Sequence, residues 1–310
     1  MRAMTNTFNA IGYLYEHALT EKVTGATSKK PGTPYINGTV SIATDPDCLN
    51  IIQIHYSYVT ATTNSGLPNA TYATLKGIID GNYSTVMTDG KENAVKVRVD
   101  SAIALNEFYS DKNGTDELVS AKRNEGGFIH IANDVTLEDF GNKFTCDMII
   151  TGVSRVEANE EKNLPEKMII RGAIFDFRKA LMPVEFSATN PAAMDYFESL
   201  NISSKEPLFT KVWGREISEV IVSTITEESA FGEPSVREVR NSRKDFLMTG
   251  ASSTPYEWDD ESTITVAELN EAIAARETYL ATLKQRQEEY KASKVQPAIM
   301  APTAGSAFNF

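Results

Sequence analysis

Aromatic and basic side chains alternate along residues 207–215, PLFTKVWGR. With the two-residue period of a β-strand, one face of this stretch carries Phe209, Lys211, Trp213 and Arg215. Bases stack on flat rings while Lys and Arg contact phosphates, so the pattern favours binding of a single nucleic-acid strand, at about 1–3 kcal/mol per stacked base. Burial in a barrel core is the alternative for each ring, because it is the commonest use of aromatic residues in strands.

A predicted hairpin at residues 167–188 repeats this alternation, and a predicted strand at 236–244 adds further cations. The candidate nucleic-acid-binding residues are therefore Arg171, Phe175, Phe177, Lys211, Trp213, Arg215, Arg237 and Arg240. For the basic cluster at 236–244 the alternative is an exposed strand edge that charge protects from pairing.

The elements that would position these residues lie within 143–250. A long strand, the hairpin, a helix with Asn190 as N-cap and Pro191 at its first position, and two more strands follow in order. This is the element order of the five-stranded OB barrel, with its helix between the third and fourth strands. The loops that flank the ligand in such barrels would be 159–166 and 227–235, and both are acidic, which would restrict the path of a polyanion.

The remaining chain predicts a mainly β protein with four further regions. Residues 1–33 are expected to be a short helical or irregular arm with a polar linker, and 34–142 a β-rich region that is either a second OB-like barrel or an elaboration of the same sheet. Residues 251–293 are predicted to form an acidic connection and a C-terminal α-helix, capped by Thr265 and Glu268. That helix packs on the barrel or pairs with another subunit, and 294–310 is expected to be a disordered tail.

Composition narrows the classes of function. A net charge of −12 over 310 residues argues against coating duplex DNA by bulk positive charge, although a local groove can still be basic. No run of about 18 apolar residues predicts a membrane span, and no secretory signal is recognisable at the start. Cys48 and Cys146 lack metal-ligand spacing, so we expect reduced cysteines, a cytoplasmic location, no metal and no cofactor.

Catalytic motifs are absent from the sequence. It contains no GxxxxGK[ST] loop, no GxSxG elbow and no HExxH helix. A two-metal nuclease would need carboxylates that converge from separate elements, for which Asp100, Asp147 and Asp176 are the candidates within predicted strands. Acids inside strands usually lie on a solvent face, so we expect a protein that is not an enzyme.

Several segments carry a resemblance to known proteins: 96–110, 120–131, 209–222, 228–239 and 264–281. Together they resemble proteins encoded by tailed bacteriophages, over about residues 35–291. The strand containing KVWG is also similar to the fourth strand of OB-fold single-stranded DNA-binding proteins. This resemblance implies support of phage DNA replication or recombination in the host cytoplasm, with single-stranded DNA and phage replication or recombination proteins as partners.

The sequence therefore leaves two hypotheses. The first is non-catalytic, sequence-tolerant binding of single-stranded DNA on a barrel face. The second is a virion or assembly protein whose barrel is a scaffold for protein contacts, which predicts stable oligomers without nucleic acid. A homo-oligomer is compatible with both.

Overall fold

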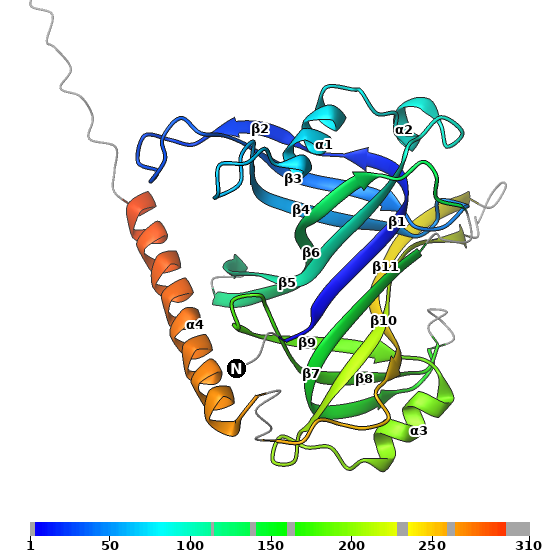
Figure 1. The fold of residues 1–310 in the computed structure, drawn as a ribbon. Helices are drawn as coiled ribbons and strands as arrows, with labels where there is room; N and C mark the ends of the chain where they lie inside the picture. Colours follow the sequence, from blue (N-terminus) through cyan, green and yellow to red (C-terminus); the bar gives the residue numbers. More distant parts are fainter. Residues whose placement is uncertain are drawn as a thin grey trace, which may run out of the picture.

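The computed structural model describes residues 4–112, 115–136, 141–159, 165–227, 235–258 and 264–295, with the side chains of 112, 219–227, 235–243 and 294–295 left aside. The protein is mainly β (Figure 1). Its strands are β1 (Asn6–His17), β2 (Thr20–Val23), β3 (Pro34–Ala43), β4 (Ile51–Thr60), β5 (Lys96–Lys112), β6 (Thr115–Ile131), β7 (Gly141–Val156), β8 (Lys167–Phe175), β9 (Leu181–Ala188), β10 (Leu208–Glu227) and β11 (Ser235–Ala251). Its helices are α1 (Ala70–Ile79), α2 (Val86–Asp89), α3 (Pro191–Ser199) and α4 (Val266–Val295).

The strands close into two rings of five. In the second ring β7, β8, β9, β11 and β10 are neighbours in that order, and β10 pairs back with β7. The first ring, β1, β3, β4, β6 and β5, has the same order and closes through the pairing of β5 with β1. In each ring a helix lies between the third and fourth strands, and the third and fifth strands pair in parallel. Both rings thus have the OB-like arrangement, and the region before residue 143 contains a barrel of its own.

The two rings also share two of their strand irregularities. A bulge interrupts the first strand against the second at Leu14 in one ring and at Ile150 in the other. Another interrupts the fourth strand against the fifth, after Asp100 in the first ring and at Trp213 in the second. Bulges bend a strand at a fixed point, so both rings bend their first and fourth strands at corresponding positions.

A pair of asparagines repeats in the same way. Asn6 accepts a hydrogen bond from the Ile103 N–H and donates to its carbonyl, at 3.1 and 2.9 Å. Asn142 accepts from the Glu216 N–H and donates to its carbonyl, at 2.6 and 2.9 Å. In each ring, therefore, a side-chain amide of the first strand takes the place of a backbone partner for the fourth strand, which extends the ladder by one residue.

Residues 6–17 were expected to be helical or irregular, and that expectation is wrong, because they form β1. Alternate side chains of β1, among them Phe8, Ala10 and Leu14, are buried in the main core. The other face of β1 points away from that core. β1 also pairs with β7, the first strand of the second ring (Figure 1). In this pairing Phe8 is opposite Phe144. This pairing joins the two barrels into one sheet.

The last hairpin of each barrel, β5–β6 in the first and β10–β11 in the second, also contacts the other barrel. Lys122 of β6 donates to the Glu185 carbonyl on β9 and lies 5.5 and 5.1 Å from the ring centres of Phe186 and Phe246. In the opposite direction, the fully buried Glu216 of β10 accepts from Asn124 of β6 at 2.5 Å. These contacts fix the barrels relative to each other.

Helix α4 packs on the barrels, which was one of the two expectations for it, the other being pairing with another subunit. Its Arg276 forms an ion pair with Glu107 of β5 at 2.5 Å, and these side chains are only 13% and 3% exposed. Near its end, Lys291 pairs with Asp111 and Asp116, at 3.0 and 2.6 Å. The predicted capping box at its start is present. The tail was predicted to begin at residue 294, but α4 runs to Val295, and 296–310 lie outside the described residues. No helix in the described ranges is long and apolar enough to cross a membrane.

Candidate nucleic-acid interface

The alternation predicted for residues 209–215 is present in β10. Thr210, Val212 and Glu216 are buried on the inner side of the strand. Lys211 and Trp213 are partly exposed on the outer side, and Arg215 is exposed. Gly214 allows β10 to lie close to β11 at this point, because a Cβ there would be 2.0 Å from the Leu247 carbonyl oxygen.

Two of the rings expected on this surface are covered. Phe175 and Phe209 belong to an outer cluster, the buried residues Ile149, Phe175, Phe209 and Ile264. The segment after β11 closes it, with Tyr256 and Trp258 at 4.8 and 5.5 Å from the Phe209 ring. Phe175 is 0% exposed, so no face of its ring is available to a base. The alternative given above, burial of the ring in the core, is therefore correct for Phe175.

The outer cluster divides the predicted binding surface in two. Along β7, Thr151 lines a cleft on one side, Ile149 lies in the outer cluster, and Lys143 is exposed on the other side. Arg171 lies with Thr151, whereas Lys211, Trp213 and Arg215 lie with Lys143. The structure therefore does not bring Arg171 together with the β10 residues.

We call the second of these surfaces the sheet face. It is the outer side of neighbouring strands β10, β7, β1, β5 and β6, and paired residues across it point the same way. Its members are Lys211, Trp213, Arg215, Thr145, Lys143, Asn9, Asp100, Arg98, Phe128 and His130.

Three cations, Lys143, Lys211 and Arg215, lie on the β10 and β7 part of the sheet face. No side chain in the described ranges forms an ion pair with Lys143, Lys211 or Arg215. The nearest acid by register is Asp147, opposite Lys211, and it is buried and engaged. Asp147 accepts hydrogen bonds from the Thr5 N–H and the Tyr256 hydroxyl, at 2.7 and 2.8 Å.

Trp213 lies between these cations and against Gly250 of β11. A Cβ at Gly250 would be 2.5 Å from the indole Cε2 and Nε1 atoms. The ring therefore packs on bare backbone on one side, and the residue remains partly exposed. A ring held by backbone in this way is preorganised for stacking.

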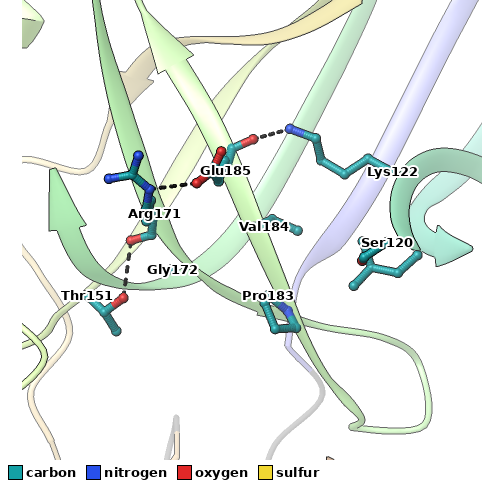
Figure 2. A pocket seen from close by; sticks show the side chains of 9 residues that line it. Ser120, Lys122, Thr151, Arg171, Gly172, Pro183, Val184 and Glu185 are labelled. Carbon is teal, nitrogen blue, oxygen red and sulfur yellow. Dashed lines mark hydrogen bonds and ion pairs between the residues drawn. The ribbon is translucent and has the colours of Figure 1, made fainter. Parts of the chain in front are cut away.

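Arg171 lines the cleft, a hollow of about 470 Å³ between the β5–β6 hairpin and the outer side of β8 and β9 (Figure 2). Its guanidinium is paired with Glu185 at 2.6 Å and donates to Ser154 at 3.0 Å. Across the cleft, burial lowers the pKa of Lys122, whose ammonium holds the Glu185 carbonyl. The second and third strands carry the ligand in OB barrels, but here Arg171 is engaged with its neighbours on β9 and β7, and Lys122 holds the β5–β6 hairpin to β9.

Phe177 follows β8 in the turn to β9 and is 88% exposed. Asp176 shapes this turn by accepting from the N–H groups of Arg178 and Ala180, both at 2.8 Å. The Arg178 guanidinium lies 5.0 Å from the Phe177 ring centre, a cation–π contact. A role of Phe177 in binding stays a prediction.

Arg237 and Arg240, the last two predicted residues, both belong to β11. The backbones of Arg237 and Arg240 lie in β11, opposite Ile225 and Val222, but their side chains fall outside the described ones. Sequence reasoning missed Phe128, His130 and Lys143. A signal was present for the first two, because the GGFIHI stretch alternates rings with Ile129 and Ile131.

The sequence model of the YorF family matches residues 5–286. The chain belongs to the YorF family. The search of curated proteins gave no match for this YorF family member.

Solved structures of two proteins are similar to it. One is a deletion mutant of the single-stranded DNA-binding protein from Thermus aquaticus, with 8% identity, 84% of this chain and 100% of that chain covered, and a TM-score of 0.45. The other is a replication protein A heterotrimer bound to single-stranded DNA, with 10% identity, 90% and 70% covered, and a TM-score of 0.19. Scores of this size identify neither a function nor a binding residue in the YorF family member.

The three acids considered for a nuclease have separate surroundings. Asp147 is buried as described, Asp176 shapes the β8–β9 turn, and Asp100 accepts from the Asn9 amide at 2.5 Å. Within the described ranges, no group of three His, Cys, Asp or Glu side chains could hold a metal ion. Each acid thus has a hydrogen-bonding role of its own.

Proposed function

We propose that this protein binds single-stranded DNA on its sheet face, without catalysing a reaction on it. Trp213 stacks with a base, and Lys143, Lys211 and Arg215 contact the phosphates on either side. Backbone contact and stacking are both indifferent to sequence, so binding tolerates any base order.

The observation that carries this proposal is the group of cations around Trp213 that form no ion pair with a described side chain. In a chain of net charge −12, cations without acidic partners are the place where a polyanion is attracted most strongly. A structural role would explain such cations poorly, because they pair with no described side chain. A partly exposed ring among them adds an apolar surface that a base can cover.

The same observation favours a single strand over a duplex. A base can lie against Trp213 only if its own face is free, and in a duplex the faces are stacked on neighbouring base pairs. The acidic balance of the rest of the chain opposes the broad phosphate contact that duplex binding needs. The expected order of affinity is therefore single strand above duplex.

The biological role is a finer part of the proposal. The resemblance of the sequence to proteins of tailed bacteriophages supports a role in phage DNA replication or recombination, in the host cytoplasm. Partners from those processes would then meet the protein on DNA.

Fluorescence anisotropy with labelled oligo-dT at low salt tests the function. Trp213→Ala with Lys211→Ala should weaken binding at least tenfold, since about 1–3 kcal/mol of stacking and one phosphate contact are lost. The matched control, Phe108→Ala with Lys29→Ala, removes an exposed ring and an exposed cation elsewhere and should bind normally. Equal affinity for duplex, or oligomers whose formation alone responds to the variants, would favour the assembly hypothesis instead.

A further inference from the structure

We infer that Phe128, His130 and Arg98 form a second stacking platform, so that one DNA strand is held across both barrels. This inference rests on the proposed function and adds a second half to its site. The platform belongs to the first barrel, whereas Trp213 belongs to the second. The chemical class recognised is the same: nucleobases on rings and a phosphate on a guanidinium.

The strand register places the platform on the sheet face. Phe128 of β6 is opposite Asp100 of β5, Asp100 is opposite Asn9 of β1, and Asn9 is opposite Lys143 of β7. Residues opposite each other in antiparallel strands point to the same side of a sheet. Phe128 therefore faces the same way as Lys143.

The Phe128 ring faces solvent beside a buried neighbour. It is 63% exposed, while its neighbour Ile129 is 1% exposed in the core. The Phe128 and His130 rings are nearly parallel, with an interplanar angle of 18° and centres 6.4 Å apart. Large apolar side chains are usually buried, so two aligned rings left facing solvent indicate a surface that a flat partner covers.

A glycine bulge holds Phe128 in this position. Gly127 has a φ of +93°, and a Cβ there would be 1.7 Å from the Asp100 carbonyl oxygen. Only glycine fits so close to the neighbouring strand. The backbone therefore fixes the direction of the Phe128 Cα–Cβ bond, which leaves the strand on the solvent side of the sheet face.

Arg98 supplies the cation of the platform. It is opposite Ile11 on one side and His130 on the other, and its side chain is 55% exposed. Its ion pair with Asp100 is 3.7 Å long and exposed, and such a pair is worth little. Asp100 also accepts from the Asn9 amide, so Arg98 can turn to a phosphate without leaving that acid alone.

The two platforms are the right distance apart for one strand of several nucleotides. Four strand spacings separate β6 from β10, which is about 19 Å at roughly 4.8 Å each. That is too far for one nucleotide to bridge. It lies well within the reach of the roughly 4–16 nucleotides that an OB fold binds.

A second copy of the chain is the other candidate for this surface, and charge argues against it. A two-fold contact places the same patch of each subunit against its copy. Here it would bring Lys143, Lys211 and Arg215 of both subunits into one interface, in which Asp100 is the acid of the sheet face. Lys is depleted from interface centres, whereas a polyanion is complementary to such a group of cations.

Anisotropy with two lengths of oligo-dT tests the second platform. One has about three nucleotides, below the roughly 4–16 that an OB fold binds, and the other has about twenty. Phe128→Ala with His130→Ala should weaken binding of the long oligonucleotide at least about fivefold, the lower limit for one stacked base. The affinity measured with the short one should change much less, because the Trp213 platform remains available to it. Phe108→Ala, an exposed ring of the same hairpin, is the control.

The outcomes of this experiment separate the second platform from the proposed function. Unchanged affinity of the double variant for the long oligonucleotide, with Trp213→Ala still impaired, would overturn the second platform and leave the proposed function standing. Absence of binding by the unaltered protein would overturn both. If light scattering shows a dimer that Phe128→Ala with His130→Ala dissociates, and DNA affinity is unchanged, the surface is a subunit interface. Arg98→Gln, which keeps both rings, should separately reduce the salt dependence of long-oligonucleotide binding.

Discussion

The salt dependence of binding gives a number that follows directly from the sheet face. Lys143, Lys211, Arg215 and Arg98 are the four cations on it that we assign to phosphates. Each phosphate contact on a single strand contributes about −0.7 to the slope of log K against log salt concentration, so four give about −2.8. Between about 50 and 200 mM salt the affinity should then fall about fiftyfold.

Lys211→Ala with Arg215→Ala should reduce this slope to about −1.4, and the loss of affinity over the same range to about sevenfold. Both side chains are on the surface, so the free energy of unfolding should change by no more than about 0.5 kcal/mol for each. The assay is a series of anisotropy titrations at rising salt, with a thermal melt of each variant.

Lys29→Ala with Lys30→Ala is the matched control, since it removes the same charge from an exposed loop. Its slope should equal that of the unaltered protein. If both double variants reduce the slope equally, or neither does, binding responds to net charge or to other cations, and the assignment of phosphates to the sheet face is refuted.

Three further predictions concern the parts that support the site. Arg276→Ala leaves Glu107 buried without its partner and should destabilise the protein by about 3–5 kcal/mol in urea unfolding, with α4 becoming sensitive to protease. Gly250→Ala places a methyl group against the Trp213 indole and should shift its emission and weaken oligo-dT binding, with little loss of stability. Burial, with Arg123 and Lys244 nearby, lowers the pKa of His55 below 6.5, so stability that is present above pH 6.5 should be lost as the pH falls below it, and His55→Gln should reduce that loss.

Two controls sharpen these predictions. Arg286→Ala removes an exposed cation from the same helix and should leave stability unchanged. Gly25→Ala adds a methyl group where no atom lies within 4 Å and should leave Trp emission unchanged. A loss in either control as large as in its partner variant would contradict the assigned contacts.

Local patterns predicted much of the second barrel. The two-residue alternation around Trp213 determined which side chains of β10 point outward, because one face of that strand is buried. Asn190 and Pro191 marked the start of α3, where Asn190 accepts from the Ala192 N–H at 2.9 Å. Gly152 marked the bulge in β7. Each of these signals depends on near neighbours in the sequence.

Contacts distant in sequence were not predictable in the same way. Nothing within residues 6–17 indicates that β7, more than 120 residues later, will be its partner. The alternation at Phe175 is the same as at Trp213, yet Ile264 and the segment after β11 cover one ring and leave the other accessible. A period of two gives the side of a strand, and only the tertiary fold decides what lies against that side.

The most direct test of the central claim uses the emission of Trp213 itself. Trp258→Phe leaves Trp213 as the sole tryptophan, since the chain has two. Saturating oligo-dT should quench its emission at low salt, and added salt should restore it, because stacking on the ring depends on the surrounding phosphate contacts. Unchanged Trp213 emission while the oligonucleotide is bound, or quenching only of Trp258 in the Trp213→Phe variant, would contradict the account.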